Sequence, residues 1–554
     1  MSCTTILVGK HASYDGSTII ARNDDSPSGD FNPKRMDVVL PEDQPRSYRS
    51  MISHAEVDLT GLEPMRYSCA PNVPSVIEVE GIWAAGGVND ADVAMTATET
   101  LTSNPRVQGA DPLVALRPAQ GTPGEEGYQP EQPGGIGEED FVTLVLPYIR
   151  SAREGVLRLG GLLERNGTYE MNGIAFSDLD EVWWLETVGG HHWIARRVPD
   201  DCYVAMPNQL GIDRFDLADA EGEGREYLCS PDLRAWMAKH HLDLTIPGGE
   251  PDVFNPREAF GSASDADHVY NTPRAWSIQR HLNPRTVRWD GPDATFTPES
   301  DDIPWCVRPE RLLAIEDVKY VLSLHYQGTP FDCYGMRGAA DMRGAYRPIG
   351  INRNNFLSVT QLRPYLPPEI MAVQWIAEGS NAFNALVPFY ANVTVTPDYL
   401  ANTTGAVSTE NFYWANRLIG ALADAHYSSC ISHVERYQLK VLSQGQQLLK
   451  MAAEEWIKRS AVKEAGKTAA AEDGADGQLP EETADSSGKQ EIWKQQTAEC
   501  GKSADGSRLQ THEFLELWNQ RIADMAREET DKLLEKVLFL SSLEMRNGFS
   551  RDDK

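Results

Sequence analysis

The sequence predicts an α+β fold with a helical extension at its C-terminal end. Segments of alternating or β-branched apolar residues recur through the first part of the chain, which is typical of strands. Residues 138–165 instead repeat apolar side chains at the spacing of amphipathic helices, and the same spacing dominates from about residue 411 onward. With 554 residues, 41% of them hydrophobic, the chain can bury a large core and carry an appendage.

The first predicted element is a β-hairpin that brings a thiol beside charged groups. Cys3 heads the β-branched run 4–8, the dipeptide Asp15-Gly16 marks a turn, and residues 17–21 form the returning strand. A thiol beside a guanidinium and a carboxylate is a candidate nucleophile. The hairpin returns three charged residues to the side of Cys3, namely Arg22, Asp24 and Asp25.

Strand and helix patterns alternate after this hairpin. Residues 138–165 are predicted to form two antiparallel helices, and shorter helices are predicted near 231–240 and 273–281. Residues 104–138, rich in Pro, Gly and Glu, are predicted to form a long surface loop that could cover a cleft. The acidic run Glu138-Glu139-Asp140 is typical of a solvated helix face. Further strands are predicted at 76–88, 93–100, 173–178, 181–187, 191–198, 372–377 and 385–390.

A change of composition divides the chain in two. We assign residues 3–407 to one domain and residues 408–554 to a C-terminal helical region. Helical periodicity runs from about residue 411 to a low-complexity insert at 463–507 and resumes beyond it, so the two helical arms are predicted to pack as an antiparallel pair. The insert is rich in Ala, Glu, Gly, Asp and Ser, which predicts a solvated linker.

Composition and charge exclude several classes of partner. A net charge of −31 argues against binding to nucleic acid or to an anionic membrane surface, because both require basic patches. No window approaches the roughly 18 uninterrupted apolar residues of a membrane span, and the N-terminal run lacks a signal-peptide pattern. Eight cysteines without CxxC spacing predict reduced thiols in the cytoplasm. The pair His191-His192 lacks the further ligands of a metal motif, so we expect neither metal nor cofactor.

The chemistry open to Cys3 depends on the two residues before it. If Met1 and Ser2 are removed, Cys3 carries a thiol and a free α-amine, whose pKa of about 7.7–8.0 suits a general base near neutral pH. Such an amine can take the thiol proton directly or through a water, as in N-terminal threonine enzymes. Arg22 would lower the thiol pKa, and Asp25 would hold the ammonium. The alternative interpretation is structural, since free cysteines are commonly buried.

Short segments spread over most of the first domain carry a family resemblance, namely Cys3–Lys10, Ser13–Thr18, Ala21–Asp25, Gly86–Asp90, Ala94–Thr100, Trp183–Trp193, Pro199-Asp200 and Pro207–Leu210. They closely resemble the bacterial dipeptidases of peptidase family C69. These are N-terminal-nucleophile hydrolases related to penicillin V acylases and bile salt hydrolases. The resemblance implies a four-layer αββα sandwich, followed here by the helical extension, in which an N-terminal cysteine attacks an amide carbonyl.

The resemblance also assigns roles by position. Cys3 matches the nucleophile, Arg22 the arginine beside it, Asp25 the aspartate that orients the amine, and Asn208 an asparagine that helps to position the amine or the oxyanion. A second oxyanion donor would lie around Thr98–Thr100, where Glu99 is an acid instead of an amide, so a backbone N–H would serve. The distal arginine of the acylases has two candidate counterparts, Arg347 and Arg363.

The resemblance therefore implies a cysteine-type dipeptidase that hydrolyses short peptides through a thioester. One alternative is an amidase that acts on N-acyl amides, as penicillin V acylases and bile salt hydrolases do. The other is a catalytically inactive binding protein with the same fold. Dipeptides or short peptides are the expected substrates, and the helical arms leave homo-oligomerisation open.

Overall fold

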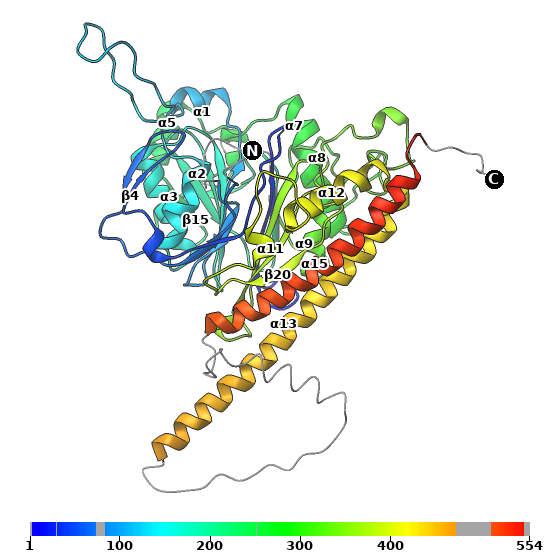
Figure 1. Cartoon of the computed structure of the whole chain (residues 1–554). Coiled ribbons are helices and arrows are strands. Elements are labelled where there is room, and N and C mark those ends of the chain that lie inside the picture. Colours follow the sequence, from blue (N-terminus) through cyan, green and yellow to red (C-terminus); the bar gives the residue numbers. More distant parts are fainter. Residues whose placement is uncertain are drawn as a thin grey trace, which may run out of the picture.

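The computed structural model describes residues 3–28, 30–73, 83–246, 248–250, 252–472 and 511–547, with the backbone alone for 462–472. Two seven-stranded sheets, antiparallel throughout, form the centre of the molecule. Helices cover both sheets, and a long helical pair runs along one side (Figure 1). The chain therefore has the α+β character that the sequence predicts.

The first sheet contains the predicted N-terminal hairpin in its interior. Strand β1 (Thr4–Val8) pairs with β2 (Thr18–Asp25), and Gly16 takes a positive φ of 81° in the connection. The sheet order is β17-β13-β1-β2-β18-β19-β20. The other strands are β13 (Tyr203–Met206), β17 (Cys306–Val307), β18 (Asn354–Leu362), β19 (Ala372–Glu378) and β20 (Val387–Tyr390).

The second sheet has the order β15-β12-β11-β10-β8-β7, and β9 also pairs with β10. The predicted hairpin around Gly189-Gly190 is confirmed, because β11 and β12 pair there. The predicted strand over 76–88 falls mostly outside the described residues, and its end forms β7. The strands are β7 (Gly86–Val88), β8 (Ala94–Thr96), β9 (Glu99–Thr100), β10 (Asn172–Ser177), β11 (Val182–Thr187), β12 (Trp193–Arg197) and β15 (Tyr227–Cys229).

Both sheets are buried on their two faces. Leu7 and Ile20 of the first sheet pack with Trp184 of the second, whereas the neighbouring Ile6 faces the helices on the outer side. Trp183 of the second sheet likewise faces helices α2 (Glu138–Val145) and α3 (Ala152–Asn166). Successive residues of a strand point to opposite faces, so burial on both sides accounts for the nearly continuous apolar runs in the sequence.

The predicted antiparallel helical pair is confirmed in the C-terminal region. Helices α12 (Phe412–Ala425), α13 (Tyr427–Glu472) and α15 (Thr511–Leu543) pack on the first sheet (Figure 1). The Tyr437 and Thr530 hydroxyl oxygens lie 2.8 Å apart, and the rings of Trp456 and Phe514 are 5.2 Å apart. The prediction that the linker begins at residue 463 is wrong, because α13 continues to Glu472. Its Ala, Glu and Lys residues are strong helix formers even without a large apolar face.

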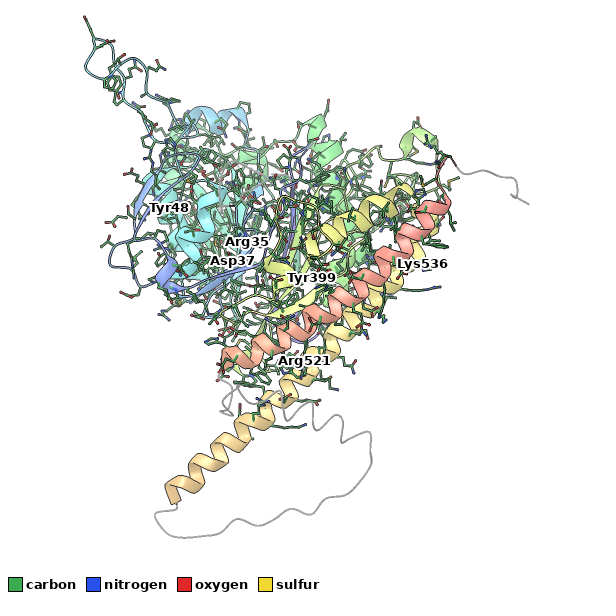
Figure 2. All side chains as sticks on the ribbon, viewed as in Figure 1. Arg35, Asp37, Tyr48, Tyr399, Arg521 and Lys536 are labelled. Atoms are coloured by element: carbon green, nitrogen blue, oxygen red, sulfur yellow. The ribbon has the colours of Figure 1, made fainter. Side chains whose placement is uncertain are left out.

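Helix α15 also protects an edge of the first sheet. The Asn519 side chain accepts a hydrogen bond from the Tyr390 backbone nitrogen (2.8 Å) and donates one to the Tyr390 carbonyl oxygen (3.0 Å). These bonds satisfy backbone groups of β20 at the end of the sheet, where strands would otherwise expose unpaired groups. Nearby, Tyr399, labelled in Figure 2, packs against Phe412 of α12 and beneath the guanidinium of Arg527. The helical region and the sheet thus share one core.

The segment 104–138 differs from the loop predicted there. It begins with helix α1 (Pro105–Ala110), for which Asn104 provides the N-cap by accepting from the backbone nitrogens of Arg106 and Val107. Its central residues are exposed and project from the body as the thin light-blue loop of Figure 1.

The remaining elements are short, and the predicted helices near 231–240 and 273–281 are confirmed as α5 and α8. None of the helices in the described ranges combines the length and hydropathy that a membrane crossing requires. The short strands are β3 (Asp37–Val39), β4 (Ser47–Arg49), β5 (Glu56–Asp58), β6 (Tyr67–Cys69), β14 (Phe215–Asp216) and β16 (Val253–Phe254). The short helices are α4 (Leu217–Glu221), α5 (Leu233–His240), α6 (Pro256–Phe260), α7 (Asp265–Tyr270), α8 (Thr272–Leu282), α9 (Ile315–Val321), α10 (Pro368–Met371) and α11 (Asp398–Ala401).

Candidate active site

Cys3 lies immediately before β1 and is fully buried. The β1–β2 register places Thr5 opposite Arg22, so the Arg22 side chain emerges on the face that also carries Thr5 and Cys3. Its Nη2 atom donates a hydrogen bond to the Cys3 Sγ atom over 2.8 Å. The hairpin therefore brings together the thiol and the guanidinium that the sequence predicts to be neighbours.

Arg22 is the centre of a buried network of charges. Besides Cys3, it donates to Glu138 Oε1 (3.0 Å) and forms an ion pair with Asp24 Oδ1 (3.2 Å). Asp24 is also paired with the buried Lys34 ammonium at 3.1 Å. Opposite charges thus alternate from the thiol outward, as buried ions require to offset their loss of hydration.

The acidic run at the start of α2 is buried, and its prediction as a solvated face is wrong. Glu138 contacts Arg22, and its backbone nitrogen donates to Glu170 Oε1 at 2.7 Å. Asp140 accepts a hydrogen bond from the hydroxyl of Tyr48, labelled in Figure 2, at 2.6 Å. Burial raises the pKa of Asp140 to about 7, with the Glu139 charge adding to the effect. The distant residues that cover this helix end gave no signal in the local sequence.

The thiol itself is not acidified. Burial raises the pKa of Cys3 far above its ordinary value, and Glu99, Asp24 and Glu138 add to that rise, while Arg22 opposes it. Arg22 therefore acts in the predicted direction, but burial has the larger effect on the thiol pKa. A thiol in this setting is protonated at neutral pH, so any nucleophilic use of Cys3 requires a base at close range.

Asp25 occupies the other face of β2 and is fully buried. Its Oδ1 atom accepts a hydrogen bond from the Asn354 side chain at 2.6 Å, and Arg347 Nη2 donates to its Oδ2 atom. Continuing the β1–β2 register by one residue places Cys3 opposite Asp24, so Asp25 lies next along β2. This is the place from which a carboxylate could hold an amino group of Cys3. Met1 and Ser2 lie outside the described residues.

Asn208 is linked to Cys3 by Arg274, a residue for which the sequence predicted no role. Arg274 of α8 is fully buried, and its Nη2 atom donates to Asn208 Oδ1 at 2.8 Å. Its Nη1 atom donates to the Cys3 carbonyl oxygen and to Thr4 Oγ1, the latter at 2.8 Å. Asn271 contributes a further acceptor at 2.7 Å. Arg274 thus ties Asn208 to the backbone of Cys3.

The two arginines that the sequence offered as distal candidates lie at different places. Arg347 belongs to the site through Asp25. Arg363 instead donates to the carbonyl oxygens of Ile370 (2.6 Å) and Met371 (3.1 Å), just beyond the end of β18 that pairs with Thr18. Thr18 and Asp25 lie at opposite ends of β2, so Arg363 is not part of the site.

Glu99 reaches the site from the second sheet. It lies on β9, and its Oε2 atom accepts a hydrogen bond from Thr5 Oγ1 at 2.7 Å. Burial raises the Glu99 pKa to about 7, and the nearby Arg274 and Arg22 oppose that rise. Its Oε1 atom is buried and accepts no hydrogen bond from any residue that the structure describes. The resemblance implied an oxyanion donor near this position. The structure has a carboxyl group there, and one of its oxygens accepts no hydrogen bond from the described residues.

The described residues bring together one group of potential metal ligands, and it does not include the pair His191-His192. His191 and His192 both contact the Asp111 carboxylate through Nδ1, at 3.0 and 2.7 Å, which holds the turn between β11 and β12. Over the same ranges one cluster has suitable ligand atoms within 4.8 Å of one another, formed by His325, Asp332 and Cys333. Its His325 Nδ1 and Asp332 Oδ1 atoms are directly hydrogen-bonded at 2.8 Å. Each of the seven described cysteines is a free thiol.

The fold and this buried thiol site agree with one known class of protein. The model of peptidase family C69 matches residues 2–440. This chain belongs to peptidase family C69, which confirms the resemblance that its sequence motifs predicted.

Relatives extend this similarity over the whole chain. A protein of Bifidobacterium longum named dipeptidase is 55% identical over 560 residues, which cover all of both chains. A probable dipeptidase A of Streptococcus pyogenes is 48% identical over 553 residues, again covering both chains completely. Dipeptidase A of Lactobacillus helveticus is 46% identical over 444 residues, which cover 80% of this chain and 86% of that one. The similarity to the first two therefore includes the helical extension.

Proposed function

We propose that this chain is a cysteine-type dipeptidase whose nucleophile is Cys3. The observation that carries the proposal is the 2.8 Å hydrogen bond from Arg22 to the Cys3 sulfur, at the head of a strand inside the first sheet. Membership of peptidase family C69 and the names of the full-length relatives support the reaction class. The packing of helices on the outer faces of two stacked sheets fits the four-layer αββα arrangement of N-terminal-nucleophile hydrolases. We place the reaction in the domain of residues 3–407 and in the cytoplasm.

The first half of the proposed reaction forms a thioester. After removal of Met1 and Ser2, the free α-amine of Cys3 takes the thiol proton, and the thiolate attacks the carbonyl carbon of the scissile peptide bond. The negative charge that develops on the carbonyl oxygen is held by the Asn208 amide and by backbone N–H groups. The Cys3 ammonium then gives its proton to the leaving nitrogen as the C–N bond breaks. The second amino acid departs, and the first remains joined to Cys3 through sulfur.

The second half returns the enzyme to its starting state. The same α-amine takes a proton from a water molecule, and the resulting hydroxide attacks the thioester carbonyl carbon. The C–S bond breaks, the sulfur recovers its proton from the ammonium, and the first amino acid leaves with a new carboxyl group. The raised pKa of the buried thiol is the reason that this scheme needs a base as close as the α-amine.

The neighbouring residues have positioning roles in this scheme. Arg274 holds Asn208 through its Oδ1 atom, which turns the donating NH2 group of that amide to the other side. Asp25, itself held by Arg347 and Asn354, is placed to orient the ammonium. Arg22 stabilises the thiolate once it forms, since a guanidinium favours the charged form of a neighbouring thiol.

A substrate panel tests this proposal directly. The purified protein is incubated with dipeptides, a tripeptide and N-acyl amides, with and without EDTA, and free amino acids are quantified. We expect dipeptide hydrolysis that EDTA does not change, because no step uses a metal ion. Hydrolysis of N-acyl amides without hydrolysis of dipeptides would favour the amidase alternative. Absence of all hydrolysis would favour a binding protein, and loss of activity with EDTA would contradict the proposed mechanism.

A further inference from the structure

We propose that Glu99 is the residue that selects substrates with a free amino terminus, its carboxylate binding the α-ammonium of the first amino acid. The inference rests on the proposed function, because the position of that ammonium follows from attack by Cys3 on the peptide carbonyl. It goes further by naming the group that the site recognises. A buried carboxylate at this place makes the unblocked N-terminus a requirement for cleavage.

The first support is the position of Glu99 along the strand that begins beside the nucleophile. Cys3 and Thr5 project from the same face of the chain, and two residues of a strand span about 6.7 Å. Thr5 donates a 2.7 Å hydrogen bond to Glu99 Oε2, which fixes the carboxyl group at this distance along the strand from Cys3. Glu99 itself is supplied by β9 of the second sheet, so it faces Cys3 across the space between the sheets.

The second support is the size of the substrate. In an amino acid the α-nitrogen lies about 2.5 Å from the carbonyl carbon. A sulfur ready to attack stands about 3–3.5 Å from that carbon, and an ammonium–carboxylate hydrogen bond spans about 2.8 Å. A carboxylate placed as Glu99 is can therefore reach the α-ammonium of the residue under attack. It stands too far along the strand to compete for the carbonyl carbon itself.

The third support is the unsatisfied state of the Glu99 carboxyl group. Glu99 is fully buried, and its Oε1 atom receives no hydrogen bond from the described residues. A buried acceptor without a donor is costly, and a ligand that brings N–H groups and a positive charge removes that cost. Arg22 and Arg274 lie close enough to act on the Glu99 charge, but they donate hydrogen bonds to Cys3, Glu138 and Asn208.

The fourth support is the contrast with Glu138, the other carboxylate near the thiol. Glu138 accepts a hydrogen bond from Arg22 at 3.0 Å, so a cation of the protein already occupies it. Glu99 is held by a neutral hydroxyl, which orients the carboxylate without neutralising its charge. Glu138 therefore has the contacts of a structural ion-pair partner, whereas Glu99 has those of a group that can bind a charged ligand.

The test compares a dipeptide with its analogue that lacks only the α-amine, such as Ala-Leu and propionyl-leucine. The wild-type protein is expected to favour the dipeptide by about 10²-fold in kcat/KM, because the analogue leaves the buried carboxylate unpaired. In Glu99→Gln, which keeps the shape and an acceptor for Thr5, kcat/KM for the dipeptide should fall by about that factor, chiefly through KM. Activity toward the analogue should not fall, because the uncharged amide leaves no unpaired carboxylate, so the preference disappears.

Controls separate this role from others. Glu99→Asp should keep part of the preference, because it retains the charge with a shorter reach. Thr5→Val should also weaken the preference for the dipeptide. It replaces Glu99→Gln as the test variant if thermal unfolding shows that Glu99→Gln is not folded. An equal loss toward both substrates would overturn the inference, and so would an unchanged preference in Glu99→Gln. A wild-type protein that cleaves dipeptides and analogues equally would also overturn it while leaving the proposed function intact. Failure to cleave any dipeptide would instead reject that function.

Discussion

Replacement of Cys3 by alanine is expected to reduce the kcat for dipeptide hydrolysis by on the order of 10³-fold or more. The substitution removes the sulfur that forms the thioester, and the hydrogen bonds of Arg22 to Glu138 and of Arg274 to Asn208 remain to hold the site together. Steady-state kinetics on one dipeptide, with binding followed separately, measures this loss.

Cys69 provides the matched control for that substitution. It is also buried, and burial raises the pKa of its thiol in the same way, but it lies on β6 and pairs with none of the residues around Cys3. Cys69→Ala should therefore keep kcat close to the wild-type value. Equal losses in the two variants, or full activity in Cys3→Ala, would show that Cys3 is a structural thiol.

Replacement of Arg22 by methionine is expected to lower both stability and activity. Arg22 is the cation that Glu138 and the Cys3 sulfur share, and its loss leaves Glu138 buried without that partner. Removal of one member of a buried ion network typically lowers the free energy of unfolding by about 3–5 kcal/mol. The thiolate also loses its neighbouring charge, so alkylation of Cys3 at a fixed pH should become slower. Urea unfolding and alkylation rates measure the two effects.

Arg35 is the control for a general effect of removing an arginine. It pairs with Asp37 at 3.4 Å, both side chains are partly exposed, and both are labelled in Figure 2. Such surface pairs contribute little, so Arg35→Met should change the free energy of unfolding by no more than about 0.5 kcal/mol. Arg22→Lys should be intermediate, because one ammonium cannot reproduce the planar set of donors. Equal stability of Arg22→Met and Arg35→Met would contradict the stabilising role of Arg22 in the buried network.

Local patterns in the sequence were enough to predict the part of the site that lies within the N-terminal hairpin. Asp15-Gly16 between two β-branched runs predicted the pairing of β1 with β2, and that pairing alone places Arg22 beside Cys3. The antiparallel helical pair was equally readable, because its apolar residues keep a regular spacing over many turns.

The rest of the site depends on contacts between distant segments. Arg274 reaches Cys3 from a short helix 271 residues later in the chain, and nothing in its local sequence separates it from a surface arginine. Glu138 was misinterpreted because acidic residues in the first turn of a helix are usually solvated, whereas here Glu138 is buried and contacts Arg22 of the first sheet. The net rise in the Cys3 pKa could not be predicted from the hairpin alone, because burial by distant segments outweighs the effect of one adjacent arginine.

The measurement that tests the central claim most directly is the intact mass of the purified, active protein, combined with N-terminal sequencing. The proposed mechanism needs the α-amine of Cys3 as its base, so the active chain is predicted to begin at Cys3 and to lack Met1 and Ser2. A fully active preparation in which every chain still carries Ser2 would contradict the account, because the amine would then be one residue away from the thiol that it must deprotonate.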